Sequence, residues 1–285
     1  DWGEDNVPGN EDDLSTSRQF TVEIHPTTAL GAVAFAEAAD VNVAAADAYY
    51  RLETSQAGRL TVEAVGGVDA SLEIYDASFT LLASSASLFG NQRAEYYAGA
   101  AGQTYYVKVA GTAAAADLRW TNLVAGTGAD VVISNAPGAD TFDFSSSNRR
   151  FTIHGVTYDL AAQGATQFTF HGGSGDSAVV RGNTLGETAN LYPNSADWTD
   201  GRWIVAVDGA PTIQIRAGAG GADQANLFGM SSAGVDKVTA YATGTQMFRT
   251  GVYLNSITGF KNVRIDGQGG GLDDVYLHDT PQDET

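Results

Sequence analysis

The residues with the clearest potential for chemistry are aspartates in glycine-rich turns that recur along the second half of the chain. One such turn has its anchor residue at positions 130, 177, 223 and 273, which lie 47, 46 and 50 residues apart. A secondary turn carries an aspartate at 140 and at 236. Carboxylate and carbonyl oxygens from flexible loops are the ligands that Ca²⁺ prefers. The pattern predicts isolated calcium ions at Asp130, Asp140, Asp223, Asp236, Asp273 and Asp274.

The same aspartates have a second interpretation, in which they only complete turns. An aspartate side chain accepts hydrogen bonds from nearby backbone amides, and glycine tolerates the positive φ that tight turns need. From the sequence both interpretations stay open.

Three aromatic residues in one loop-rich stretch form a second candidate site. Tyr192, Trp198 and Trp203 have two aspartates between them, Asp197 and Asp200. Exposed rings stack on sugars and carboxylates bind hydroxyl groups, so the stretch predicts a carbohydrate contact. The alternative is packing in the core, where large aromatic side chains are more commonly found.

Catalytic motifs are missing from the sequence. It contains no zinc-binding His-Glu-x-x-His pair, no nucleophile elbow and no phosphate-binding loop. Scattered arginines (Arg181, Arg202, Arg216 and Arg264) are candidates for the base of a calcium-dependent polysaccharide lyase, although nothing selects one of them. We therefore expect a protein without enzymatic activity, with a polysaccharide lyase or other carbohydrate-active enzyme as the alternative.

Charge and composition exclude several kinds of partner. The chain has 34 acidic and 15 basic residues and a formal net charge of −19. Such a surface repels a phosphate backbone, so we expect no nucleic-acid partner. No segment approaches the roughly 20 consecutive apolar residues of a membrane helix, so we expect no membrane insertion. Disulfides and thiolate chemistry are excluded because the chain has no cysteine.

The period of about 47 residues predicts stacked repeats over residues 125–285. Three segments alternate apolar and polar residues, so Phe168 and Phe170, Ile213 and Ile215, and Val263 and Ile265 should face a core, while Thr169, Gln214 and Arg264 face water. A parallel β-helix fits best, with two coils per repeat; a β-propeller fragment and a second sandwich are the alternatives. The fourth repeat stops at Thr285, which predicts a longer parent polypeptide or an end cap.

The preceding residues divide into two further regions. Residues 1–19 are rich in acids and should form an N-terminal segment or linker. Residues 20–124 contain short runs with period-two alternation, such as Leu60-Thr-Val62 and Leu72-Glu-Ile74. Such runs, separated by turn residues, predict half-buried antiparallel strands and a β-sandwich.

Ordered blocks in residues 28–123 resemble the bacterial pre-peptidase C-terminal domain family. The blocks are Asp47-Ala-Tyr49-Tyr50-Arg-Leu52, Ala57-Gly58-Arg-Leu60-Thr-Val62, Asp69-Ala-Ser-Leu72-Glu-Ile74-Tyr75-Asp76, Leu81-Leu82-Ala83-Ser84 and Ala101-Gly102-Gln-Thr-Tyr105-Tyr106-Val107-Lys-Val109. The resemblance implies a secreted jelly-roll sandwich appended to an extracellular protein, sometimes binding matrix polymers or calcium. It suggests a calcium ligand at Asp47, although this chain has Ala48 where family members often carry a second acid.

The glycine-aspartate turns distantly resemble the RTX calcium repeats, Gly-Gly-x-Gly-x-Asp-x-apolar-x. In that family the turns follow one another about every nine residues, whereas here they return about every 47, so rows of calcium ions are not implied. Together these features predict a secreted or cell-surface accessory or adhesive segment that contacts a polysaccharide or matrix polymer.

Overall fold

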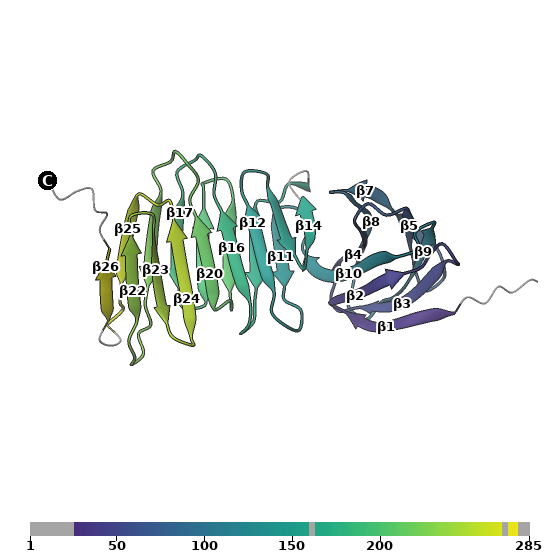
Figure 1. Cartoon of the computed structure of the whole chain (residues 1–285), viewed down its shortest axis with the longest axis horizontal. Helices are drawn as coiled ribbons and strands as arrows, with labels where there is room; N and C mark the ends of the chain where they lie inside the picture. Colours follow the sequence, from purple (N-terminus) through teal and green to yellow (C-terminus); the bar gives the residue numbers. More distant parts are fainter. Residues whose placement is uncertain (1–25, 160–162, 270–272, 279–285) are drawn as a thin grey trace, which may run out of the picture.

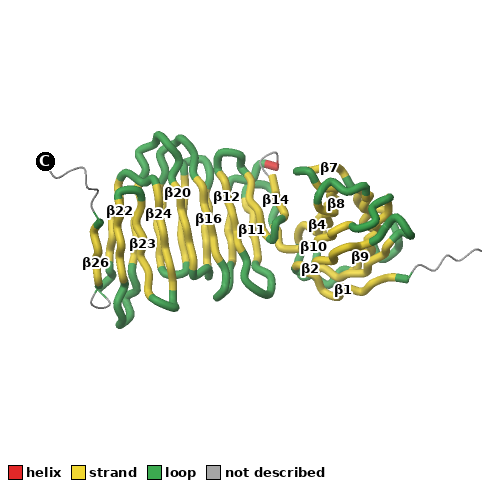
Figure 2. Tube along the Cα trace, viewed as in Figure 1, coloured by secondary structure: helices red, strands yellow, loops and turns green. Residues whose placement is uncertain are grey.

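The computed structural model describes residues 26–159, 163–269 and 273–278. The predicted acidic segment 1–19 lies outside the described residues. The described chain forms 26 β-strands arranged as two β-rich parts along the long axis (Figure 1; Figure 2). No helix in these ranges is long and apolar enough to cross a bilayer.

The first part is the predicted two-sheet sandwich. Its strands are β1 (Thr27–Val33), β2 (Phe35–Val41), β3 (Ala48–Thr54), β4 (Gly58–Val65), β5 (Ala70–Tyr75), β6 (Leu81–Ser84), β7 (Ala86–Leu88), β8 (Asn91–Ala98), β9 (Thr104–Gly111) and β10 (Ala116–Ala125). One sheet has the order β1-β3-β9-β5-β6. Its inward residues, including Leu52, Leu72 and Ile74, pack against Leu60 and Trp120 of the facing sheet. The alternation in the sequence therefore arises from one buried and one outer face.

The sandwich continues into the second part through β10. This strand pairs with β4 and β2 inside the sandwich and, at Val124 and Ala125, with β11 of the repeats. The expected boundary at 124/125 thus falls inside β10. Tyr158 Oη lies 2.6 Å from Thr121 Oγ1 across the junction, and both side chains are buried. Both parts therefore share one twelve-stranded sheet, here called the junction sheet.

The second part is a β-solenoid made of two facing sheets. Its strands are β11 (Asp130–Ser134), β12 (Thr141–Ser145), β13 (Arg150–Ile153), β14 (Val156–Asp159), β15 (Gln167–His171), β16 (Ser177–Arg181), β17 (Thr188–Tyr192), β18 (Ser195–Thr199), β19 (Ile204–Asp208), β20 (Thr212–Arg216), β21 (Gln224–Phe228), β22 (Lys237–Tyr241), β23 (Gly244–Arg249), β24 (Tyr253–Thr258), β25 (Asn262–Asp266) and β26 (Asp274–Leu277). They divide between the junction sheet and a nine-stranded sheet of order β14-β13-β12-β16-β20-β24-β23-β22-β26.

Each repeat is a unit of five strands that changes sheets from one copy to the next. In the first unit, β12, β13 and β14 form an antiparallel meander in the nine-stranded sheet, β15 crosses to the junction sheet, and β16 returns. In the second unit, the meander β17-β18-β19 lies in the junction sheet and β20 crosses the other way. The third unit, β22 to β26, repeats the first.

This route explains the period seen in the sequence. The meanders begin at Thr141, Thr188 and Lys237, which are 47 and 49 residues apart. Strands of successive turns pair in parallel and in register, as β15 does with β11 and β19. The predicted β-solenoid is therefore confirmed, but a repeat is one meander plus two crossing strands and not two simple parallel coils.

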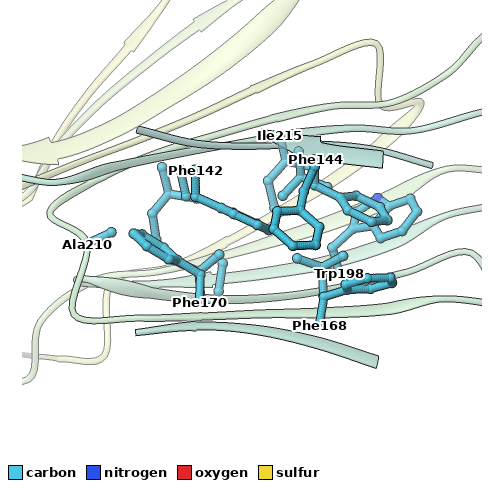
Figure 3. Packing of buried hydrophobic residues seen from close by; sticks show 14 of the residues in the cluster. Phe142, Phe144, Phe168, Phe170, Trp198, Ala210 and Ile215 are labelled. Carbon is cyan, nitrogen blue, oxygen red and sulfur yellow. The ribbon is translucent and has the colours of Figure 1, made fainter. Parts of the chain in front are cut away.

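The solenoid core is a layer of aromatic side chains between the two sheets. Phe142 and Phe144 project from one sheet toward Phe168 and Phe170 of the other, with ring centroids of facing pairs 5.0–5.1 Å apart (Figure 3). All four rings are buried, and Trp198 packs beside Phe144. Ring pairs at such distances contribute beyond their buried area. The packing shows why one repeat needs its neighbours: each unit supplies strands to both sides of a shared core.

Candidate functional site

Acidic residues are linked in pairs where the chain passes between the sheets. The pairs are Asp140 with Asp176, Glu187 with Asp223, and Asp236 with Asp273. In each pair the backbone N–H of the first acid donates to the carboxylate of the second, over 2.8, 3.2 and 3.4 Å. The first acids are 47 and 49 residues apart and the second acids 47 and 50. These carboxylates are thus a repeating part of the turn.

The first pair lies at the start of the solenoid. Asp140 accepts a hydrogen bond from the Ala136 amide, and Asp176 accepts one from the Gly173 amide at 2.6 Å. Both acids are buried. His154 Nε2 lies 2.5 Å from Asp140 Oδ1, and the His154 ring stacks on Phe35 of the sandwich with centroids 3.9 Å apart. This turn therefore also connects the solenoid to the sandwich.

The second pair contains two buried carboxylates with no basic partner in an ion pair among the described residues. Glu187 accepts hydrogen bonds from the Asn183 and Gly218 amides. Burial raises the pKa of Glu187, whereas those amides favour its charged form and the Asp223 carboxylate adds to the rise. Gly182 leaves room for the Glu187 carboxylate in this position: a Cβ there would lie 2.0 Å from Oε1, so the Glu187 side chain would have to move.

In the third pair, Asp236 forms an ion pair with an arginine. Asp236 is fully buried and accepts hydrogen bonds from Met230 N–H, Arg249 Nε and Tyr253 Oη at 2.8, 3.0 and 3.0 Å. Burial raises the pKa of the Tyr253 phenol, and the hydrogen bond to Asp236 raises it further. Charge-assisted bonds of this kind are stronger than neutral ones. This turn is therefore held by a connected polar network.

The raised pKa of Glu187 predicts a pH dependence. A carboxyl group that binds its proton more tightly when folded contributes stability fully below its ordinary pKa, and this contribution is lost as pH rises through the folded pKa. Glu187→Gln, which resembles the protonated acid, should therefore gain stability relative to wild type as pH rises above the ordinary carboxyl range. Urea unfolding of both proteins at several pH values measures this. Asp197→Asn, at an exposed carboxylate, is the control. If the difference in unfolding free energy between wild type and Glu187→Gln does not change with pH, the prediction is wrong.

The structure assigns the six predicted calcium ligands to different environments. Asp140, Asp223 and Asp236 are buried and accept backbone amides, and Asp273 accepts one as well. Asp130 and Asp274 are exposed first residues of strands β11 and β26. Among the described residues, no three His, Asp or Glu side chains gather as a metal cluster. The hydrogen bonds agree with the turn-completing interpretation, while calcium binding stays a prediction.

Sequence reasoning did not assign Asp176 and Glu187 to the turns. The sequence alignment of the repeats matches Asp130 and Ser177 with Asp223. In the structure the equivalents of Asp223 are Ala129 and Asp176, so the first two anchors are one residue out of register. The equivalents 129, 176, 223 and 273 are 47, 47 and 50 residues apart, which is a more regular spacing. This more regular spacing is the sequence signal that could have identified Asp176 as the equivalent of Asp223. Glu187 was missed because its longer side chain occupies an aspartate position.

The three predicted carbohydrate-contacting aromatics do not form one patch. Trp198 is only 1% exposed and packs on Phe144, so its ring has no face for a sugar. Trp203 is partly buried against the core beneath the Arg149 guanidinium. Tyr192 is exposed, but it lies at the opposite end of the β17–β18 hairpin and stacks on Phe228 with centroids 4.7 Å apart. The three aromatic residues are therefore one core residue (Trp198), one partly buried ring (Trp203) and one exposed ring (Tyr192), at separate places.

Other candidates from the sequence also have local partners. Asp47 forms an ion pair with Lys108 Nζ at 3.2 Å. Ser177, the anchor residue of the second turn, has its Oγ 3.0 Å from Thr141 Oγ1 on the neighbouring strand. Arg181 forms an ion pair with Asp143, and Arg264 one with Asp266 at 3.4 Å. The described structure brings none of these residues together as a catalytic set.

The two outer faces of the solenoid differ in charge. In the described strands of the nine-stranded sheet, the outward charged side chains are four basic and three acidic: Arg150, Arg181, Arg216, Lys237, Asp143, Asp159 and Asp274. In the described solenoid strands of the junction sheet they are one basic and four acidic: Arg264, Asp130, Asp197, Asp208 and Asp266. The nine-stranded sheet is therefore a basic-leaning face on an acidic protein.

The sequence matches no protein-family profile and no curated protein. Among solved structures, the pre-peptidase C-terminal domain of a collagenase from Bacillus anthracis is similar to part of this chain, with a TM-score of 0.28 and 10% sequence identity. The likeness covers 35% of this chain and 98% of that domain. The likeness concerns the fold alone. In the structure, this chain combines a two-sheet β-sandwich with a β-solenoid.

Proposed function

We propose that this chain is a non-catalytic accessory or adhesive segment of a larger bacterial extracellular protein, secreted or at the cell surface, and that it contacts a polysaccharide or matrix polymer. The observation that carries the proposal is the solenoid itself, which presents two extended strand ladders with side chains in register. Neighbouring strands lie about 4.8 Å apart, so such a face repeats its contacts along its length. A polymer with repeating units is the kind of ligand that suits repeated contacts.

Side chains on the outer faces support this role. Asn190 and Asn226 occupy the same position on adjacent strands, and their amides hydrogen-bond to each other at 2.9 Å. Asp197, Ala206 and Thr169 continue the same row on the other side. Amides and hydroxyl groups are both donors and acceptors, as the hydroxyl groups of sugars require. A row of this kind supports contact with a polar polymer.

The junction with the sandwich supports an attachment role. Arg93 is buried and forms an ion pair with Glu63 of the sandwich at 2.5 Å, and its guanidinium also donates to the Thr157 carbonyl of the solenoid. Buried charge pairs with additional hydrogen bonds resist separation because breaking one leaves an unpaired charge. A polymer held on the solenoid would therefore be held rigidly relative to the sandwich. The resemblance of the sandwich sequence to pre-peptidase C-terminal domains supports the extracellular setting.

A binding and turnover assay tests the proposal. The whole chain is incubated with neutral and acidic polysaccharides, with retention measured by affinity electrophoresis and unsaturated products by ultraviolet absorbance. We expect retention by at least one polymer without product formation. Calcium-dependent product formation would instead establish the polysaccharide-lyase alternative, and the absence of retention by every polymer would remove the binding role.

Calcium belongs to this proposal as a stabilising ion. Asp223 Oδ2 is buried beside Glu187 and has no hydrogen-bond partner among the described residues. A cation bound at this turn would offset the buried negative charge of the two carboxylates. An ion bound only to the folded state stabilises it by RT ln(1 + c/Kd) at a free ion concentration c, so the melting temperature rises with the ion concentration. We expect the melting temperature to rise in millimolar CaCl₂ and fall in EDTA, by calorimetry. Equal melting curves in both conditions would remove calcium from the proposal.

A further inference from the structure

The outer surface of the nine-stranded sheet carries two neighbouring hollows. One, of 480 Å³, lies over β20, β22, β23 and β24, and its lining includes Arg216, Tyr241 and Gly244. The other, of 430 Å³, lies over β12, β13, β14 and β16, and its lining includes Arg150 and Arg181. Strands β16 and β20 are direct neighbours, so the two hollows adjoin on one face.

Arginines follow one row across this face. Ser145 pairs with Arg150 on one side and Arg181 on the other, and Arg181 pairs with Arg216. Adjacent strands place Arg181 and Arg216 about 4.8 Å apart along the sheet. Like charges at directly paired positions are destabilising. An anion that lies over this row would reduce the repulsion between Arg181 and Arg216.

Arg216 is the member of the row that is available to a ligand. Arg150 and Arg181 form ion pairs with Asp159 and Asp143. Arg216 has only a 3.4 Å contact with Gln214 Oε1, and no carboxylate of the described residues lies within ion-pair distance of it. Its planar guanidinium can bind a carboxylate or sulfate through two parallel hydrogen bonds.

The hollow beside Arg216 has the shape and chemistry of a saccharide subsite. Arg216 forms one wall, and Tyr241 forms the other three strands away, about 14 Å across. The Tyr241 ring is 51% exposed and is held by stacking on His278, with centroids 4.7 Å apart. Between the walls the floor is lined by Thr258, Ser256 and two glutamines, Gln214 and Gln246. A ring for stacking, hydroxyl and amide groups, and a cation thus line one depression.

Glycine keeps the floor of this hollow low. Gly244 pairs with Tyr241 on one side and Thr258 on the other, between the two walls. A Cβ at this position would lie 2.4 Å from the Ile257 carbonyl oxygen, so no other residue fits without a shift of the backbone. The close approach of β23 and β24 therefore also creates the space next to the Tyr241 ring.

We propose that the Arg216–Tyr241 hollow binds an anionic polysaccharide, whose carboxylate or sulfate groups pair with Arg216 while a sugar ring stacks on Tyr241. From Arg216, the bound polysaccharide would extend along the arginine row toward Arg181 and Arg150. The inference rests on the proposed polymer contact and names its ligand class and its face. The protein's net charge of −19 does not prevent this, because charges beyond about 8 Å are largely screened at physiological ionic strength.

Binding of the whole chain to three defined polymers tests the proposal: polygalacturonate for carboxylate, dextran sulfate for sulfate, and neutral dextran. Wild type should bind one of the acidic polymers more tightly than dextran. Arg216→Gln should weaken that binding about five- to ten-fold and reduce its salt dependence, since it removes one charge-assisted contact. Tyr241→Ala should weaken it similarly. Arg51→Gln, at an exposed arginine of the sandwich, makes the same change in net charge and should have no effect.

The outcomes separate this inference from the proposed function. If wild type binds polymers but Arg216→Gln and Arg51→Gln bind them equally well, the hollow is not the site, while the proposed function stands. If wild type binds none of the polysaccharides, both fail. Equal binding of double-stranded DNA would show that polymer charge alone is recognised and would overturn the saccharide assignment. Circular dichroism of each variant confirms that the compared proteins are folded.

Discussion

Replacing Arg249 with methionine is expected to lower the free energy of unfolding by about 3–5 kcal/mol, the effect of removing one partner from a buried ion pair. Arg249 donates to both oxygens of Asp236, at 3.0 and 3.1 Å, and the Asp236 side chain is fully buried. Methionine retains most of the aliphatic volume but leaves the carboxylate, among the described residues, with the Tyr253 hydroxyl and the Met230 amide as its hydrogen-bond donors. The cost comes from the uncompensated charge.

Chemical denaturation measures this effect, with two matched variants. Arg264→Met removes an exposed arginine whose partner Asp266 is 3.4 Å away, and should change stability by less than about 1 kcal/mol. Adding Asp236→Asn to Arg249→Met should recover part of the loss because it removes the buried charge. Equal shifts for Arg249→Met and Arg264→Met would mean that the network around Asp236 does not hold the turn.

Replacing Trp198 with alanine should cost about 3–5 kcal/mol, as large-to-small substitutions in a core do. The indole is fully buried and packs on the ring of Phe144 with centroids 6.1 Å apart (Figure 3). Its removal leaves a cavity between the two sheets that close-packed neighbours fill only in part. Thermal and urea unfolding measure the loss.

Comparison with a second variant separates the core role of Trp198 from a ligand role. Tyr192→Ala removes an exposed ring that contacts Phe228 and should cost far less stability. A contact residue for sugar would show the opposite pattern, with stability retained and polysaccharide binding lost. A Trp198→Ala protein of wild-type stability would therefore contradict the packing in the structure.

The inward and outward faces of the crossing strands were predictable from alternation. Phe168, Phe170, Ile213 and Ile215 are all buried as expected, because a strand shows alternate residues to its two faces. Arg264 is exposed as expected. Val263 and Ile265 of the same strand are 40% and 37% exposed, because β25 is the last strand of its sheet among the described residues.

The change of sheet between repeats could not be predicted. An inward residue is apolar whichever sheet carries its strand, so Ala178 of the nine-stranded sheet and Ala225 of the junction sheet give the same sequence pattern at equivalent positions. The aspartates were recognisable as repeated turn residues, but their partners were not. The Asp140–Asp176 contact joins residues from two different turns, and local spacing holds no information about it.

The change of sheet between repeats gives repeat number a parity. A single inserted repeat would move every strand that follows it to the opposite sheet. The outward side chains of those strands would then lie on the other outer face of the solenoid. Two repeats restore the original side, and they span 96 residues from Thr141 to Lys237. Lengthening or shortening such a solenoid without exchanging its two downstream outer faces therefore requires the gain or loss of repeats in pairs.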